Sequence, residues 1–336
     1  MRWHLAALIV VLAPLAPQSI AQDRDSELEE VIVTAQHRAE SAIDTPISLF
    51  TLNAEQLEKQ RIGSISNLNG LIPNLNIDSF PANNQTLRLF IRGVGLSDTQ
   101  ITQDPAVGVY LNGAYIARSA GLTFDVADLE RIEVLRGPQG TLFGKNTSAG
   151  VINVVTKRPD FVRSGEVELT LGAPGATGFS GSFNTPVGAN NAFRIFATKR
   201  TRDGFMDVRT GSGTSREDSD QDFHSVRAQW RFTPNDAWDV NFTADYTKRD
   251  ENCCTAVTTV RGLTADIVDR LSVDEGVARI ADPEARRAWS NRVTEQHIRD
   301  QGLSAEVNWN TPWLGGATLT SITAARDWDT VNGLDF

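Results

Sequence analysis

The chain has 336 residues, 40% of them hydrophobic, with a mean hydropathy of −0.26 and a formal net charge of −10 at pH 7. This acidic balance disfavours nucleic acid and anionic lipid surfaces as partners, because both attract clustered Lys and Arg. The four histidines are scattered, and the sequence has no HExxH, no GxSxG and no clustered acid pair in a recognisable catalytic setting. The sequence therefore predicts no enzyme, no metal site and no cofactor.

Residues 1–21 have the pattern of a secretory signal peptide. Arg2 precedes an apolar run from Leu5 to Ala16, and the small residues Ser19 and Ala21 precede the expected cleavage point. The run is too short to span a bilayer and prolines interrupt it, which disfavours the alternative of an uncleaved anchor helix. No later stretch offers about 18 consecutive apolar residues, so membrane insertion would require a closed β-barrel.

The next segment, residues 22–44, begins with polar residues and is expected to be a flexible tail. From residue 45 to 158 the pattern is mixed, with an alternating apolar run at 47–52 and helical patterns at 54–61 and 64–71. The later half of this region is rich in glycine, as tight loops require. The pattern indicates a small α+β domain.

Five motifs stand out between residues 28 and 160. They are LEEVIVTAQ at 28–36, IPNLNI at 72–77, LFIRGVG at 89–95, PAVGVYLNGAYIAR at 105–118 and RIEVLRGPQGTLFGKNTSAGVINVVTKRP at 131–159. In this order they resemble the plug domain of TonB-dependent outer-membrane receptors. The resemblance implies a plug over residues 45–158, held in an outer-membrane barrel that begins at residue 159. Asn112 departs from the family pattern, which often has Asp there.

The resemblance also implies roles for individual residues. The TonB box is expected to pair as an added strand with the periplasmic protein TonB, or else to be an ordinary first strand of the plug. It comprises Glu30, Val31, Ile32, Val33, Thr34 and Ala35. Arg92 and Arg136 are expected to meet carboxylates of the barrel or the plug, among them Glu166, Glu168 or residues of the longer receptor, or else to stay solvated. The residues that would shape the plug and its contacts with the barrel are Arg92, Gly93, Arg136, Gly137, Pro138, Gly140, Gly144, Asn146, Gly150 and Asn153.

After Pro159 the sequence alternates apolar and polar residues with period two. Seven strands are predicted, at 166–171, 178–185, 192–202, 223–233, 238–248, 300–310 and 317–328. Connections beside Thr-Pro pairs, at 186–191, 234–237 and 311–316, alternate with those at 172–177, 203–222 and 249–299. Outer-membrane barrels have short periplasmic turns and longer outer loops in this way. A soluble β-sandwich is the alternative, and aromatic residues at strand ends disfavour it, namely Phe183, Phe232, Trp238, Trp309 and Trp313.

Seven strands are few beside the roughly 22 of plugged transporters, so we expect an incomplete barrel and the amino-terminal part of a longer receptor. The adjacent Cys253 and Cys254 are candidates for a disulfide with each other or with another protein. The cargo that the resemblance favours is a ferric siderophore. An oligosaccharide, cobalamin or haem is the alternative, as is a surface adhesin that transports nothing. Cargo contacts are expected from two polar apex loops, Ser79 to Thr86 and Gly95 to Pro105.

Overall fold

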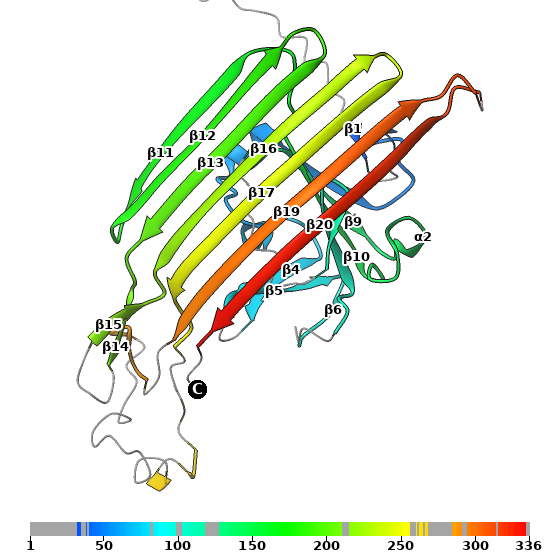
Figure 1. Ribbon diagram of the computed structural model, residues 1–336. Helices are drawn as coiled ribbons and strands as arrows, with labels where there is room; N and C mark the ends of the chain where they lie inside the picture. The colour runs from blue at the N-terminus through cyan, green and yellow to red at the C-terminus, as the bar shows by residue number, and fades with distance from the viewer. Residues whose placement is uncertain are drawn as a thin grey trace, which may run out of the picture.

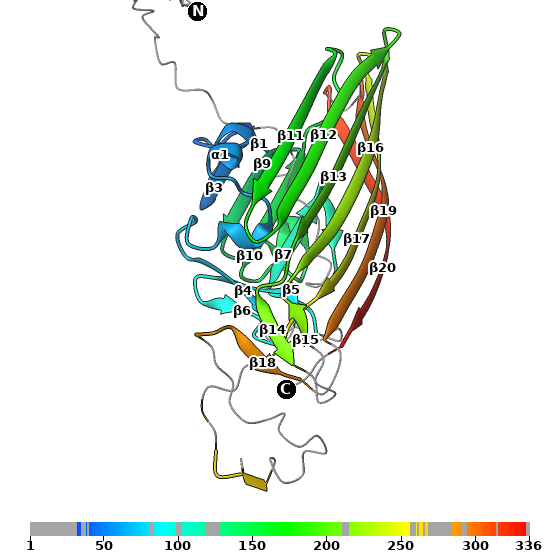
Figure 2. The same cartoon turned by 90° about the vertical axis from the view of Figure 1, so that its left-hand side faces the viewer.

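The computed structural model describes residues 32–34, 38, 40–80, 83–98, 103–117, 128–209, 215–255, 260, 262–264, 266–267, 284–290, 294–313 and 315–333. Two parts make up the fold: a mixed α+β domain and, from residue 164, a curved antiparallel sheet. The domain lies against the concave side of the sheet (Figures 1 and 2). We call the domain the plug and the sheet the wall. The sheet is open, with β11 and β20 at its two edges, which confirms the predicted plug and incomplete barrel.

The plug is built on a five-stranded sheet. Its order is β3 (Leu49–Asn53), β9 (Leu129–Arg136), β10 (Gly150–Thr156), β7 (Val107–Leu111) and β8 (Ala114–Ile116). β10 is buried along its whole length, parallel to β7 and antiparallel to β9. The apolar run VINVV suits a strand that is covered on both faces. A second sheet packs apolar side chains into the same core and consists of β4 (Leu75–Phe80), β5 (Asn83–Ile91) and β6 (Val94–Gly95).

Two short helical segments join β3 to β4. α1 (Ala54–Lys59) begins after Asn53, whose side chain accepts from the Gln56 amide while the Gln56 side chain accepts from the Asn53 amide. The 3-10 helix η1 (Ile65–Leu68) is shorter than the helix predicted around it, because Asn69 already has an extended backbone. The prediction was therefore right about the element and wrong about its length.

Three small elements complete the plug. β1 (Ile32–Val33) pairs with β2 (Glu40–Ser41), and α2 (Gly140–Phe143) is one turn that follows β9. Within the described ranges, no helix has the length and hydropathy needed to cross a bilayer.

The wall contains all seven predicted strands. In order they are β11 (Ser164–Gly172), β12 (Ala176–Val187), β13 (Asn191–Arg202), β16 (Gln221–Asn235), β17 (Trp238–Asn252), β19 (Glu295–Asn310) and β20 (Thr318–Asn332), each antiparallel to the next. The long connections carry a further sheet of β14 (Met206–Arg209), β15 (Ser215–Asp218) and β18 (Arg287–Trp289). It was not predicted, because its strands are very short and β14 pairs with a distant part of the chain.

The two faces of the wall are reversed relative to a soluble sheet. On β16 the outward residues Val226 and Trp230 are 40% and 36% exposed. On the concave face of β16, Arg227 and Gln229 are each 4% exposed. A β-sandwich buries its apolar face and leaves the polar face to water, so the sandwich alternative is wrong. The pattern is that of a barrel wall, with lipid outside and a polar lumen.

Short turns join β12 to β13, β16 to β17 and β19 to β20 at one end of the wall. Pro186 and Pro234 were predicted to lie in the connections, but they lie near the ends of β12 and β16. A β-bulge accommodates Pro234. Aromatic rings gather at this end, where Trp238 stacks on Trp309 with ring centroids 5.3 Å apart. Such rings are typical of a membrane interface.

Gly302 allows an ion-pair network to cross three strands of the wall. It lies in register between Asp245 on β17 and Arg326 on β20. Arg326 donates to the two carboxylate oxygens of Asp245 over 2.8 and 2.9 Å, and to Asp300 over 2.8 Å. A Cβ atom at position 302 would stand 2.5 Å from the guanidinium and 2.7 Å from the Asp245 carboxylate. Glycine therefore provides the space through which Arg326 reaches β17.

Candidate functional site

The segment predicted to bind TonB is docked on the plug where the structure describes it. β1 pairs with β2, Val33 is fully buried in a small apolar cluster of the plug, and Ile32 is 45% exposed. The prediction of a flexible tail up to residue 44 is therefore wrong for these two strands. Burial of Val33 and strand pairing offset the entropy lost on ordering them. Three residues of the predicted TonB box, Glu30, Val31 and Ala35, lie outside the described residues.

A buried carboxylate holds the residue that follows β1. Glu133, on β9, is 0% exposed. Its Oε1 accepts from the Thr34 amide at 2.8 Å, the Thr34 hydroxyl at 3.3 Å and Arg131 Nε at 2.7 Å. Its Oε2 accepts from Asn153 Nδ2 at 3.0 Å. Arg131 also donates to the Thr34 hydroxyl at 3.0 Å and pairs with Glu130. Four donors thus meet on one carboxylate.

Thr34, Arg131, Glu133 and Asn153 form what we call the Glu133 cluster. A buried ionised carboxylate is stable only with such partners. Glu133 and Asn153 are opposite each other in the β9–β10 ladder, so displacing Thr34 would break contacts at the centre of the plug sheet. Sequence reasoning missed Arg131 and Glu133. The available signal was a pair of charges, two residues apart, in a strand that is otherwise mostly buried and apolar.

The predicted plug-signature residues lie mainly at turns and strand ends. Gly150 begins β10 with a φ of 156°, where a Cβ atom would collide with the Leu135 carbonyl oxygen on β9. Asn146 Nδ2 donates to the Tyr115 hydroxyl at 3.0 Å. Gly93 lies in the turn between β5 and β6, and the signature residues that surround α2 are Gly137, Pro138, Gly140 and Gly144.

Arg92 and Arg136 do not meet the predicted carboxylates. Arg136 Nη1 donates to the Pro73 carbonyl oxygen at 3.4 Å, and the described residues contain no carboxylate paired with either arginine. Glu166 pairs with Lys157 at 3.4 Å instead, and Glu168 accepts from a threonine on its own strand. The prediction is wrong for these two glutamates, because β11 lies beside the segment that leaves the plug.

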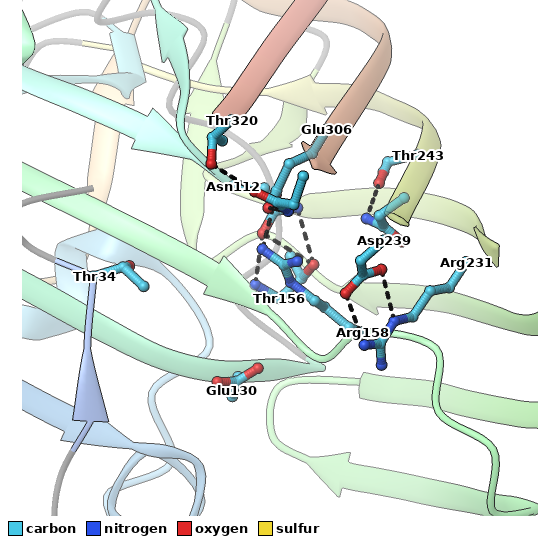
Figure 3. Close-up of polar contacts among 12 residues, drawn as sticks. Thr34, Asn112, Glu130, Thr156, Arg158, Arg231, Asp239, Thr243, Glu306 and Thr320 are labelled. Atoms are coloured by element: carbon cyan, nitrogen blue, oxygen red, sulfur yellow. Dashed lines mark hydrogen bonds and ion pairs between the residues drawn. The ribbon is translucent and has the colours of Figure 1, made fainter. Parts of the chain in front are cut away.

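Several polar contacts join plug and wall (Figure 3). Arg158, at the end of the plug after β10, donates to Glu306 on β19 at 2.7 Å. Arg194 on β13 makes a bidentate pair with Asp128 of the plug, and the two side chains are 8% and 2% exposed. A cavity of about 510 Å³ lies between these parts and is lined by Arg158 and Arg194, among others. A polar interface of this kind can be hydrated.

Asn112 has a defined role in the turn between β7 and β8. Its Oδ1 accepts from the Thr156 amide at 2.9 Å and its Nδ2 donates to Thr156 Oγ1 at 3.0 Å (Figure 3). Gln229 of the wall donates to the same hydroxyl at 3.3 Å. The Asn112 side chain supplies a donor that an ionised Asp lacks. Through the Thr156 hydroxyl, this uncharged side chain connects the β7–β8 turn with Gln229 of the wall.

Tyr110 on β7 connects the five-stranded sheet of the plug with α2. Its hydroxyl donates to the Phe143 carbonyl oxygen, and the two rings meet edge to face with centroids 5.1 Å apart. Burial raises the pKa of Tyr110 to about 12. The phenol therefore remains a neutral donor at physiological pH.

The predicted apex loops are described only in part, since residues 81–82 and 99–102 lie outside the described ranges. In the second loop, Asp104 pairs with Lys145 at 2.6 Å, which raises the pKa of the lysine. Beyond β17, the Sγ atoms of Cys253 and Cys254 are bonded to each other. No group of His, Cys, Asp and Glu in the described part of the chain has the arrangement of a metal site.

Known proteins share both the plug sequence and the fold. Residues 41–151 match the TonB-dependent Receptor Plug Domain family. The pesticin receptor of Yersinia enterocolitica is 31% identical over 159 residues, which are 47% of this chain and 23% of that receptor. The pesticin receptor of Yersinia pestis gives the same identity and coverage. The chain thus spans about a quarter of the length of the curated relatives it matches.

Solved receptors have the same arrangement of plug and wall. The ferric yersiniabactin uptake receptor FyuA from Yersinia pestis superposes with a TM-score of 0.70 at 20% identity, over 86% of this chain and 42% of that one. The pyoverdine outer membrane receptor FpvA from Pseudomonas aeruginosa PAO1 gives 0.66 at 16% identity, over 88% and 39%. The alcaligin receptor FauA from Bordetella pertussis gives 0.63 at 14%, over 89% and 42%. Residues 41–151 thus match the plug-domain family of TonB-dependent receptors, and the chain shares the fold of these solved outer-membrane receptors.

Proposed function

We propose that this chain supplies the plug, the TonB-binding segment and part of the wall for energised import of a ferric siderophore across the outer membrane. The observation that carries the proposal is the docked segment at β1, which lies at the edge of a plug held in a polar lumen. An outer membrane has no ATP, and a plug blocks diffusion. A plugged barrel transports cargo only if work from outside displaces the plug.

The segment Glu30–Ala35 is the part of the chain that TonB would bind and pull. A short extended segment can add itself as a strand to the edge of a partner sheet, where main-chain hydrogen bonds supply affinity and alternate side chains supply register. Val33 is buried in the docked state and Ile32 is half exposed. Binding of TonB as an added strand would therefore compete with docking, and tension on the bound segment would act first on Thr34 and the Glu133 cluster.

Binding to TonB tests the first half of the proposal. Ile32→Pro removes a backbone donor and disrupts strand pairing, so the full chain carrying it should lose binding to the periplasmic domain of TonB. Ile43→Pro is the matched control, since Ile43 is 91% exposed and lies outside the segment. Equal binding by the wild type and Ile32→Pro would refute the assignment of the TonB box.

Uptake tests the cargo. The solved neighbours are receptors for yersiniabactin, pyoverdine and alcaligin by their descriptions, which favours a siderophore here. Cells that carry a complete receptor containing this chain should take up labelled ferric siderophore, and deletion of residues 31–35 should abolish uptake. Uptake that persists in the deletion would reject energised transport. Uptake of a labelled oligosaccharide, cobalamin or haem instead would change the cargo, and surface adhesion without any uptake would reject transport altogether.

A further inference from the structure

The bond between Cys253 and Cys254 lies where three segments of the long connections meet. β17 ends at Asn252, directly before the two cysteines, and the Cys253 amide donates to the Thr294 carbonyl oxygen at 3.2 Å, just ahead of β19. The Ser219 amide, just after β15, donates to the Asn252 carbonyl oxygen at 2.8 Å. Figure 2 shows β14, β15 and β18 at this end of the wall. We call it the outer end.

A buried carboxylate beside the disulfide holds the same segments together. Asp218, the last residue of β15, is 0% exposed. Its Oδ2 accepts from the Thr255 hydroxyl at 2.7 Å and from the Thr294 hydroxyl, and the two hydroxyl oxygens are 3.0 Å apart. Its carbonyl oxygen accepts from the Phe205 amide at 3.1 Å, ahead of β14. We call Asp218, Thr255 and Thr294 the Asp218 clasp. A buried carboxylate depends on such donors, so loss of one donor weakens the clasp.

The conformation of Cys254 places Thr255 at the clasp. Its φ is 79°, in the left-handed region that a residue with a side chain rarely adopts. Such a conformation persists only where its surroundings impose it. The bond to Cys253 does so, because it closes a covalent ring through the backbone of the two residues. Once the ring is opened, Cys254 can return to a negative φ, and Thr255 then moves away from Asp218.

The surroundings of the two sulfur atoms favour exchange with a thiol. Cys253 is 4% exposed, whereas Cys254 is partly exposed, so the Cys254 sulfur is the one that an external thiolate can attack. Cys253 is then the leaving group. Its Sγ lies 3.6 Å from Oε1 of Gln296, a buried side chain on β19. After protonation the Cys253 thiol can donate to this oxygen, so the reduced form finds a hydrogen-bond acceptor in place.

We propose that Cys253 and Cys254 form a thiol-reactive site, and that their reduction by a small external thiol opens the Asp218 clasp and releases the long connections. Two thiol groups react in turn. The first thiolate forms a mixed disulfide with Cys254 and displaces Cys253, and the second thiolate attacks the mixed disulfide and displaces Cys254. The two cysteines take up the two protons, and the external thiols leave as a disulfide. The inference does not depend on the cargo or on TonB.

Amide hydrogen exchange of the full chain in detergent micelles, with and without dithiothreitol, tests the proposal. The amides of Phe205 and Cys253 both donate to residues of the clasp, so reduction should make them exchange about tenfold faster or more. The ladder amides of β16 and β17 should keep their protection. After removal of the dithiothreitol, iodoacetamide should modify both cysteines of the treated chain and neither of the untreated chain.

Substitutions at Thr255 separate the clasp from the disulfide. Thr255→Val removes the hydroxyl and keeps nearly the same shape, so the Phe205 amide should exchange about tenfold faster while the disulfide stays intact. Thr255→Ser keeps the hydroxyl and is the matched control, with exchange as in the wild type. The double variant Cys253→Ala and Cys254→Ala should exchange fast at Phe205 both with and without dithiothreitol.

Three results would overturn the proposal. If both cysteines stay unmodified after treatment, no thiol-reactive site exists there. If both are modified and the amides of Phe205 and Cys253 exchange as before, the bond does not hold the clasp. If β16 and β17 lose protection to the same extent, the bond supports the whole wall. Should the double variant lose its β-sheet circular dichroism, the reduced wild type and the two Thr255 variants decide without it. TonB binding by the same samples shows whether the proposed function stands separately.

Discussion

Replacing Glu133 by glutamine should release the TonB-binding segment while leaving the plug folded. Four donors meet on this carboxylate, three of them on Oε1 and one on Oε2. Glutamine has nearly the same shape but one acceptor oxygen and one amide nitrogen. In either orientation the amide would face donors, from Asn153 on one side or from Thr34 and Arg131 on the other.

The magnitude follows from the contacts of Thr34 and Val33. A hydrogen bond to a charged acceptor contributes about 1.5–3 kcal/mol, and burial of a valine about 1.5–3 kcal/mol. Ordering the backbone of residues 32–34 costs about 1–2 kcal/mol per residue. These gains and costs nearly cancel, so the docked state is only marginally favoured. Loss of about 1.4 kcal/mol shifts the docking equilibrium about tenfold, so Glu133→Gln should increase the undocked fraction by about one order of magnitude or more.

Amide hydrogen exchange measures this shift directly. The Thr34 amide should exchange about tenfold faster in Glu133→Gln than in the wild type, while the amides of β10 remain protected. Glu130→Gln is the matched control, because Glu130 is the other carboxylate partner of Arg131, is 47% exposed and does not contact Thr34. The control should leave Thr34 protected.

Two results would contradict the reasoning. If Thr34 exchanges at the wild-type rate in Glu133→Gln, the carboxylate does not hold the segment. If Thr34 and β10 become unprotected together, Glu133 supports the whole plug and not the docking of the segment.

Three further predictions concern the plug and the wall. Gly302→Ala should destabilise the wall by about 1–3 kcal/mol, seen as a lower urea midpoint, because its Cβ would press on Arg326; an unchanged midpoint would contradict this. Burial raises the pKa of Tyr110 from 10 to about 12, so the stability it contributes is complete below about pH 10 and is lost as pH rises through about 12. Tyr110→Phe should abolish that loss and remove the latest tyrosinate absorbance step, whereas an unaltered titration would show that another tyrosine is responsible. A double-mutant cycle on Arg158→Ala and Glu306→Ala should give a coupling of about 0.5–3 kcal/mol between plug and wall, and strict additivity would mean that their 2.7 Å contact stabilises nothing.

The sequence by itself determined the elements and the kind of surface each one presents. Period-two alternation at 223–233 and 238–248 assigned every side chain to one of two faces, and the structure confirms those faces on β16 and β17. Alternation is local, because it follows from the geometry of a single strand. The plug motifs are also local runs of residues, and they were sufficient to predict the family.

Only the tertiary structure decided which residues meet. Thr34 and Glu133 are 99 positions apart, and nothing near Thr34 in the sequence indicates a carboxylate partner. The partners expected for Arg92 and Arg136 were wrong for the same reason. The Asp245–Arg326 ion pair across Gly302 follows from strand register, and a shift of two residues between two strands would keep every side chain on its face while separating Arg326 from Asp245. A strand pattern therefore specifies the face of a side chain, whereas its neighbours depend on how distant strands align and on where the plug rests against the wall.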